Sequence, residues 1–374
     1  MAIMTIPRPL HIALDDLGWF CPTDDRAQGG PSRTGASRRH CYKDYLAVNE
    51  LGKRLGMKIS CAFVLGEWDP DNRLRSVKGL SKYGDGWDNA SFLDKEEMQR
   101  CVEAINSSEY IELTVHGLLH GYYTDGIDNT DESDFYYRIN KAPYIIPEDE
   151  VRHRLDCYFD LLDHYKINKK VNSFIPPTFT YRWDEISRIL ADYGIEYVST
   201  IFRTMKYEGD KKEIVDVEPN GIITIDRNNN IIPWNQMNCD FSEIDNGVSG
   251  VFGMHWPNLL HDDPDRNSEA VERAAEFFER CSQNFGTIIS KGINFCATQS
   301  LYCKYAKISE EDGVTTIDIS GVPRLPQTDG LFYVSSKEPI ETWIGCEVYD
   351  YEVKDGFATY AVKPISNVMR FDNV

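Results

Sequence analysis

The sequence contains no apolar run of about 18 residues, the length that a helix needs to cross a bilayer. It has ten cysteines, but none stands in the Cys-x-x-Cys spacing of a zinc ribbon, and so long a chain does not require a disulfide framework. The first residues also lack the charged start, apolar stretch and cleavage site of a signal peptide. These absences predict a cytoplasmic protein with reduced cysteines, among which Cys61, Cys157 and Cys296 lie in apolar, core-like stretches.

Basic residues are also scarce, with 40 Lys and Arg against 60 Asp and Glu and a formal net charge of −20. Nucleic acids and anionic membranes attract basic surfaces, so we expect neither as a partner. The excess of Asp and Glu most simply indicates an acidic surface whose charges repel one another. No pattern in the sequence indicates an oligomeric state.

Two segments about a hundred residues apart carry the strongest chemical signal. An apolar strand at residues 10–16 ends in the adjacent carboxylates Asp15 and Asp16, and another at residues 110–115 runs into His116 and His120. Strands that end in polar residues deliver them to one rim of a parallel sheet or barrel. Histidines at i and i+4 on a helical turn can reach one metal ion, and a carboxylate completes a three-ligand site. Alternatively, the histidines mark a helix start and the aspartates a turn or helix cap.

With these two segments the sequence resembles the polysaccharide deacetylase superfamily, the NodB-like carbohydrate esterases. The residues that carry the resemblance follow the family's order of motifs over about residues 8 to 300. They are Ala13-Leu-Asp-Asp-Leu17 followed by Gly18, His116-Gly-Leu-Leu-His120, Phe174-Ile-Pro-Pro-Thr178 and Gly253-Met-His255. The resemblance implies that Asp15 is the catalytic base, that Asp16, His116 and His120 bind the metal, and that His255 is the acid.

Three departures from the family pattern concern the surroundings of the base and the metal. Gly117 replaces the hydroxyl residue of the histidine motif, and Ile175 stands where the family has an arginine that orients the base, so that partner is missing or comes from elsewhere. The fourth motif, an Asp before an aromatic, has only a loose match at Asp240. These departures place the standard substrate in more doubt than the metal site.

Strand and helix patterns alternate through residues 1–307 and predict parallel strands with crossover helices. Residues 293–297 are the last predicted strand of this α/β pattern, which by the resemblance becomes a distorted (β/α)7-type barrel. Residues 308–374 contain β-rich segments, among them 343–353, separated by Gly, Pro and Asp turns. We predict a second, small antiparallel β domain there, which either caps the barrel or binds glycan or a partner.

Three long segments follow the strands on the side of the expected site: residues 17–40, 66–93 and 121–146. Long ordered loops commonly bind ligands, and aromatic rings suit the C–H face of a sugar. The alternative is that these rings pack the loops on the barrel. The residues predicted to bind substrate are Trp19, Arg38, Arg39, Trp68, Tyr122, Pro176 and Trp256.

An arginine cluster follows the aspartate pair in this otherwise acidic chain. Because guanidinium groups bind carboxylate or phosphate through paired hydrogen bonds, Arg26, Arg33, Arg38 and Arg39 suggest an anionic group on the substrate. The alternative is that these arginines pair with the protein's own acidic surface.

The sequence therefore predicts a metal-dependent hydrolase that removes an acyl group, such as acetyl, from an amino sugar or a related small amide. Its partner would be a small or oligomeric carbohydrate. Zn²⁺ suits two imidazoles and a carboxylate, and Fe, Co or Ni would fit the same ligands. Two alternatives stay open: a catalytically weak or inactive carbohydrate-binding or regulatory protein on the same fold, and a metal-dependent glycosidase or lyase.

Overall fold

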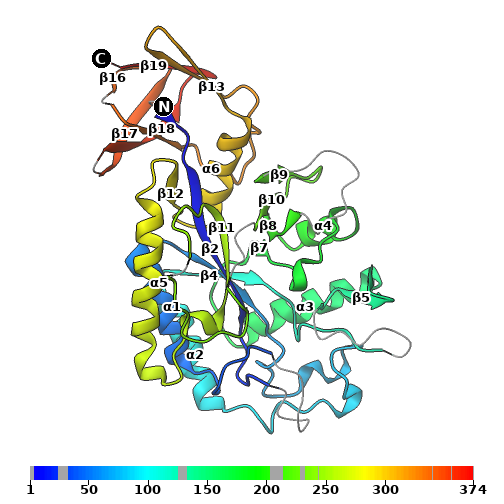
Figure 1. Cartoon of the computed structure of the whole chain (residues 1–374). Helices are drawn as coiled ribbons and strands as arrows, with labels where there is room; N and C mark the ends of the chain where they lie inside the picture. The colour runs from blue at the N-terminus through cyan, green and yellow to red at the C-terminus, as the bar shows by residue number, and fades with distance from the viewer. Residues whose placement is uncertain are drawn as a thin grey trace.

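The computed structural model describes residues 4–23, 33–124, 133–202, 214–227, 232–242, 244–338, 340–354 and 356–373, which form a mixed α/β fold around one curled sheet (Figure 1). All strand pairs of this nine-stranded sheet are parallel except β9 with β10. Among the described residues no pairing joins β11 to β9 or β10, so the sheet is open rather than a closed barrel. In spatial order its strands are β11 (Gly250–His255), β2 (Arg8–Leu17), β3 (Ile59–Phe63), β4 (Ile111–Val115), β7 (Ser173–Phe174), β8 (Tyr197–Thr200), β10 (Ile223–Asp226) and β9 (Val215–Val217), with β12 (Thr287–Ile289) on β2.

Helices connect the strands as the sequence predicts. Asp94 caps one of them by accepting the backbone N–H groups of Glu96 and Glu97. Another begins directly after Pro147, with three acidic residues in its first turn. In Figure 1, α1, α2 and α5 lie to the left of the curled sheet and α3 and α4 to its right, and residues of all five helices pack in one buried cluster. The helices are α1 (Tyr42–Leu55), α2 (Lys95–Ser107), α3 (Glu148–His164), α4 (Trp183–Asp192), α5 (Asn267–Ser282) and α6 (Ile293–Tyr305).

The predicted last barrel strand is wrong. Residues 293–297 begin helix α6, which packs against β2, β8, β9, β10 and β11 of the large sheet and against β15. Its residues from Ile293 to Leu301 are almost all buried, so no polar face marks the period of a helix. A short apolar run cannot be assigned to strand or helix by periodicity alone.

The C-terminal part consists of two four-stranded antiparallel sheets, as the sequence predicts for this stretch. The predicted strand at 343–353 is two strands, because the chain turns at Gly345 (φ +83°), where a Cβ would lie 2.8 Å from the carbonyl oxygen of Val368. One sheet runs β1 (Met4–Thr5), β15 (Phe332–Ser336), β18 (Phe357–Pro364), β17 (Cys346–Lys354), and the other β13 (Lys307–Glu311), β14 (Val314–Asp318), β19 (Val368–Asn373), β16 (Ile340–Ile344).

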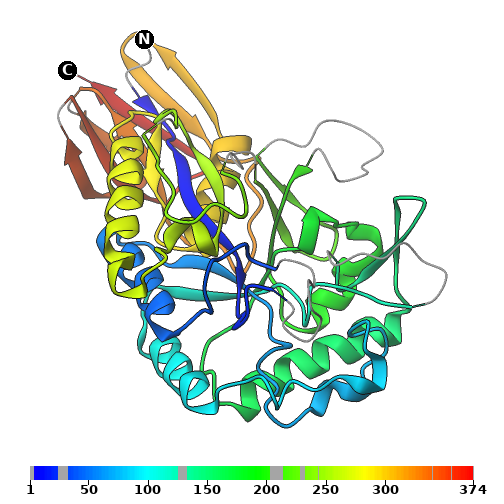
Figure 2. The same cartoon turned by 60° about the horizontal axis from the view of Figure 1, so that its bottom comes forward.

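The first strand of the chain thus belongs to the C-terminal sheets, so the boundary expected at residue 307 does not separate all of the secondary structure. These sheets lie at one end of the molecule, and β2 ends toward the other (Figure 1). Figure 2 turns that second end toward the viewer. The mixed α/β class with separate small antiparallel sheets is confirmed, whereas the (β/α)7 count and the two-domain division stay predictions.

Three further findings bear on the sequence-based expectations. All ten cysteines are free thiols, as expected. No helix of the described residues is long and apolar enough to span a membrane. A β-hairpin, β5 (Tyr136–Ile139) with β6 (Ala142–Ile145), was not predicted and stands in the segment that follows the two histidines.

Candidate metal centre

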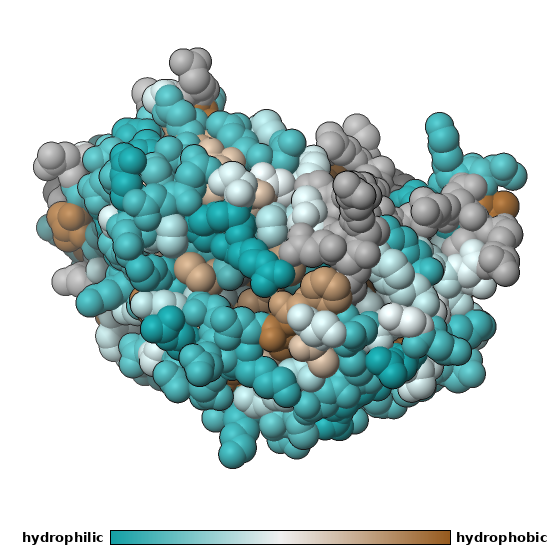
Figure 3. Space-filling model, turned by 90° about the horizontal axis from the view of Figure 1, so that it is seen from below, coloured by the Kyte–Doolittle hydropathy of each residue, from teal (hydrophilic) through white to brown (hydrophobic). Residues whose placement is uncertain are grey.

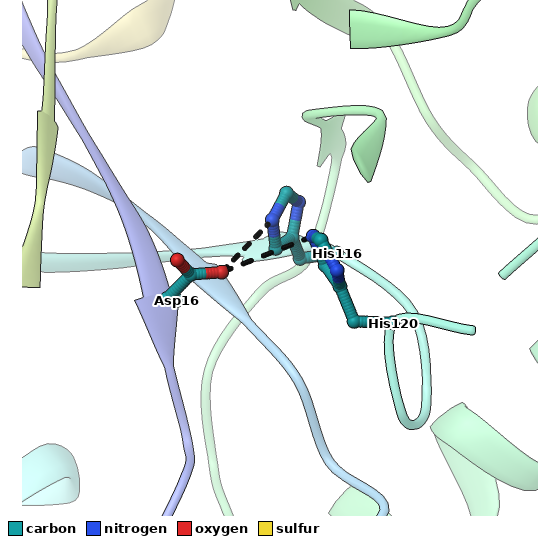
Figure 4. A group of neighbouring side chains, drawn as sticks. All are labelled: Asp16, His116 and His120. Carbon is teal, nitrogen blue, oxygen red and sulfur yellow. Dashed lines mark ion pairs between the residues drawn. The ribbon is translucent and has the colours of Figure 1, made fainter. Parts of the chain in front are cut away.

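Three predicted metal ligands meet at one edge of the sheet. Because β2 and β4 are parallel strands on either side of β3, Asp16 at the end of β2 lies near the two histidines that follow β4. The Oδ1 atom of Asp16 is 3.6 Å from Nε2 of His116 and 3.9 Å from Nε2 of His120, and the side chains point toward one another (Figure 4). Atoms that share an ion at about 2.1 Å lie roughly 3–4 Å apart, so these three residues could hold a metal.

The end of β2 is shaped so that adjacent carboxylates serve one site. In a regular strand Asp15 and Asp16 would point to opposite faces. Here the register between β2 and β3 shifts between Leu14 and Leu17, and Asp16 has a left-handed φ of +65°. Gly18 follows at φ +97°, where a Cβ would lie 2.1 Å from a backbone oxygen. A glycine at position 18 is therefore required by this bulge.

The histidines do not lie on a helical turn, which corrects the geometry expected from their spacing. Residues 116–120 form an irregular bend with positive φ at Gly117 (+102°) and His120 (+54°). Strained backbone of this kind gathers at functional sites when the surrounding structure enforces it.

The buried His116 is fixed by its second ring nitrogen. Its Nδ1–H donates to the backbone carbonyl of Ile175 at 2.6 Å, which leaves Nε2 facing Asp16. Metal-binding histidines are commonly oriented by such a bond, because it sets the tautomer and the ring direction. The residue that lacks the family's arginine side chain thus contributes its backbone to the centre.

The charges of the centre favour a cation. Burial alone would raise the pKa of Asp16, but the hydrogen bond with His116 and the nearby imidazoles of His120 and His255 lower it to about 2. Burial would also lower the pKa of His116, yet Asp16 and Asp15 raise it above its ordinary value. An ionised carboxylate surrounded by imidazoles is a donor set that a divalent metal can occupy by displacing protons.

The predicted base, Asp15, has a buried arginine partner from another strand. Nη1 of Arg227 lies 3.0 Å from Oδ1 and 2.8 Å from Oδ2 of Asp15, and the Arg227 side chain is fully buried. Arg227 directly follows β10, at the same end of the sheet as the other site residues. The partner missing at Ile175 is therefore supplied from elsewhere in the chain. Arg227 was not among the predicted site residues, although it stands at the end of an apolar strand as Asp15 and His116 do.

His255 is the last residue of β11 and is paired in register with Asp15 of β2. Its charge contributes to the lowered pKa of Asp16, so it lies close to the centre. Its role as an acid stays a prediction. Asp240, the loose match to the fourth motif, is exposed, and its carboxylate accepts the N–H of Ser242 within a local turn.

Most residues predicted to bind substrate are buried in the protein instead. Trp68 and Trp256 have no exposed surface; the Trp68 indole donates to the Gly18 carbonyl at 2.7 Å, and Trp256 stacks on His40 at 4.1 Å. The prediction that these two tryptophans contact substrate is corrected, since both pack loops onto the sheet. Also buried are Trp19, Tyr122 and Pro176. Large aromatic side chains gain more by covering loop backbone than by staying exposed.

Arginines of the cluster that follows the aspartate pair also form ion pairs with carboxylates of the protein itself. Arg38 forms a two-pronged ion pair with the buried Asp44 at 2.9 and 2.7 Å, and Arg33 pairs with Glu67. These pairs favour the alternative interpretation of the cluster, in which the arginines balance the chain's own carboxylates. Arg39 is exposed and donates to the carbonyl of Phe92 at 3.3 Å, and Arg26 lies outside the described residues.

The face seen from below, toward which β2 ends, is hollowed near its middle, and hydrophobic side chains gather there among hydrophilic ones (Figure 3). This is a surface on which a ligand with both apolar and polar parts would find contacts.

No protein family model and no curated protein matches the sequence. Among solved structures, the chain is similar to a putative polysaccharide deacetylase from Mycobacterium smegmatis, with a TM-score of 0.36 and 12% identity over 66% of this chain and 73% of that chain. It is also similar to a GH57-type branching enzyme from Pyrococcus horikoshii, with a TM-score of 0.39 and 14% identity over 80% of this chain and 64% of that chain.

Proposed function

We propose that the protein is a metal-dependent hydrolase that removes an acetyl or similar acyl group from the nitrogen of an amino sugar or a related small amide. One observation supports this most strongly: three residues that could hold a metal stand beside a second carboxylate, Asp15, which is held by a buried arginine and is not one of the three. That division is what a hydrolase needs, because one group must bind the metal while another accepts a proton.

The ligand set suits Zn²⁺, since it offers two imidazoles and one carboxylate and leaves positions open. A bound divalent metal would supply a water of lowered pKa and would polarise the scissile carbonyl. Asp16, His116 and His120 would hold it, and the Ile175 carbonyl keeps the His116 ring oriented for it.

The remaining steps belong to the chain's own residues. Asp15 accepts the proton of the attacking water on a carboxylate oxygen, while Arg227 keeps that carboxylate in place. As water adds to the carbonyl carbon, the C–N bond breaks and His255 gives a proton to the departing nitrogen. The products are the free acid and the amine. Asp15 then releases a proton to solvent and His255 takes one up, which restores both residues.

The alternative of an inactive binding or regulatory protein drew its support from the missing arginine at Ile175 and from the weak fourth motif at Asp240. The Arg227–Asp15 pair weakens that support, because the base has a guanidinium partner after all. An anionic substrate is not part of the proposal, since Arg38 is engaged by Asp44.

The test is release of acetate from a panel of N-acetylated amino sugars by protein loaded with Zn²⁺ or Co²⁺, compared with chelator-treated protein. We expect metal-dependent release that falls by about 10²-fold in Arg227→Met, with metal content unchanged, because a misplaced base costs about that much. A surface variant, Arg266→Met, serves as the control. Metal binding without acetate release from any compound of the panel would favour the binding-protein alternative. Release of monosaccharides from oligomeric compounds of the panel would favour a glycosidase.

A further inference from the structure

The loop that carries both histidine ligands has no regular structure of its own, so other residues must hold it. Its backbone receives support on one side from β3, where the His116 N–H donates to the Phe63 carbonyl at 3.1 Å. On the other side, the N–H groups of Leu118 and Leu119 donate to a single carboxylate, that of Asp134, at 2.6 and 3.3 Å. These two N–H groups lie between the histidines, so the carboxylate fixes the part of the loop that sets their separation.

Asp134 is fully buried and is itself held by Arg154 of α3. The distance between Arg154 Nη1 and Asp134 Oδ1 is 3.0 Å, and neither side chain is exposed. Arg154 also donates to the carbonyls of Lys78 at 3.0 Å and Gly121 at 3.4 Å, and Gly121 directly follows the second histidine. The ion pair therefore joins helix α3 to the middle and the end of the metal loop.

The sequence of the loop is matched to this carboxylate. A Cβ at Gly117 would lie 2.7–2.8 Å from the Cβ, Cγ and Oδ2 atoms of Asp134, closer than real Cβ atoms come, and the φ of +102° also disfavours a side chain. Gly117 stands where the motif of the resembled family has a hydroxyl residue. In this chain a buried carboxylate occupies that space and accepts the loop's N–H groups.

We propose that Asp134, held by Arg154, is a positioning residue that sets the distance and direction of the His116 and His120 side chains for metal binding. It does not contact the metal or the substrate. The inference rests on the proposed function only for the presence of a metal at the centre. Residues that orient metal ligands typically change metal affinity by about 10- to 100-fold when they are replaced.

The test compares Asp134→Asn with Asp44→Asn by titrating metal-free protein with Co²⁺ and following its visible absorption. Asp44 is a matched control, since it is also a fully buried carboxylate that pairs with an arginine and accepts a backbone N–H, but it lies at the start of α1. We expect Asp134→Asn to bind Co²⁺ about 10- to 100-fold more weakly and with an altered spectrum. Asp44→Asn should lower the melting temperature and keep the affinity and spectrum of the wild type.

If Asp134→Asn does not fold, Gly117→Ala serves instead, since a methyl group there pushes on the same carboxylate, and the same loss of affinity is expected. Wild-type affinity and spectrum in a folded Asp134→Asn or Gly117→Ala protein would overturn the inference. The readout contains no substrate. Failure to release acetate, with Co²⁺ binding that depends on Asp134, would overturn the proposed reaction and leave this inference standing.

Discussion

At the carboxyl end of β2, two neighbouring carboxylates have different surroundings. Asp16 faces imidazoles, whereas Asp15 faces the guanidinium of Arg227. The difference comes from the bulge, which turns both side chains toward the site while keeping them on different partners. Two carboxylates of one sequence motif can thus take separate roles because of their neighbours.

We expect replacement of the two carboxylates to separate metal binding from activity. His116→Ala and Asp16→Ala should abolish metal binding, because each removes one of three ligands. Asp15→Asn should keep the metal and lose activity, because the amide cannot accept the proton. Metal analysis of the purified variants beside acetate release measures both effects. An empty site in Asp15→Asn together with a full one in Asp16→Asn would reverse the assignment.

The pKa shifts at the centre predict how a metal stabilises the protein at different pH values. The raised pKa of His116 contributes stability to the metal-free protein below about pH 6.5 that is lost as the pH rises through the folded-state value. The lowered pKa of Asp16 contributes stability above about pH 4 that is lost as the pH falls toward 2. Between about pH 4 and the folded-state pKa of His116, a metal must displace the His116 proton. Metal binding therefore strengthens as the pH rises.

The increase in melting temperature caused by Zn²⁺ should therefore grow between about pH 6 and pH 8. Thermal melting with and without the metal at several pH values measures it. His116→Ala is the control and should show almost no increase at any pH. A constant increase across this range in the wild type would contradict the prediction.

At the scale of elements, the sequence predicted the helices with a polar face better than the helix without one. Helices α1, α2 and α3 have amphipathic patterns, and the helical patterns visible in the sequence at 42–55, 94–105 and 147–165 agree with their bounds to within a few residues. Helix α6 is buried along most of its length, so its pattern carried no period and it was taken for a strand. Short β9 and β10 were missed, and with them the position of Arg227.

The site residues also could be predicted from the sequence only in part. Adjacent carboxylates and spaced histidines are visible in the sequence because each set is local. Arg227 and Asp134 were not found, because their partners lie 212 and about 16 residues away in the chain and only the fold brings them together. The aromatic residues were misassigned for a different reason: composition shows that a loop has tryptophans but not which way they face.

One buried amide joins α6, β15 and the segment between β1 and β2, and its loss should destabilise the protein without affecting the candidate metal centre. Gln299 of α6 donates to the carbonyls of Pro7 at 2.8 Å and Tyr333 at 3.0 Å and accepts the Tyr333 N–H at 2.9 Å. Gln299→Leu removes all three hydrogen bonds to these buried backbone groups, at a cost of about 3 kcal/mol. Chemical denaturation measures the loss, and Co²⁺ titration should give the wild-type affinity. A stability change below about 0.5 kcal/mol would contradict the expectation.

At the scale of the whole molecule, the C-terminal sheets are tied to the large sheet by elements from both ends of the chain. Strand β1 pairs with β15, and Tyr302 of α6 stacks on Phe332 of β15 at 4.2 Å. One buried cluster contains Ala13 of β2 together with Phe332 and Phe371 of the C-terminal strands. A core that spans both parts favours a single cooperative unit over two independently stable domains.

Truncation after residue 306 should therefore not give a stable, metal-binding fragment. Removing the C-terminal sheets would expose the apolar side of α6 and leave β1 without its partner strand, and exposed apolar surface of this kind causes aggregation. We expect the fragment to be insoluble, or to lack a cooperative melting transition, while the full chain melts in one step. Calorimetry of the full chain and Co²⁺ titration of the fragment test this. A soluble fragment that binds Co²⁺ with the affinity of the full chain would show that the sheets are a separable domain, with a role of their own at the end of the molecule away from the metal centre.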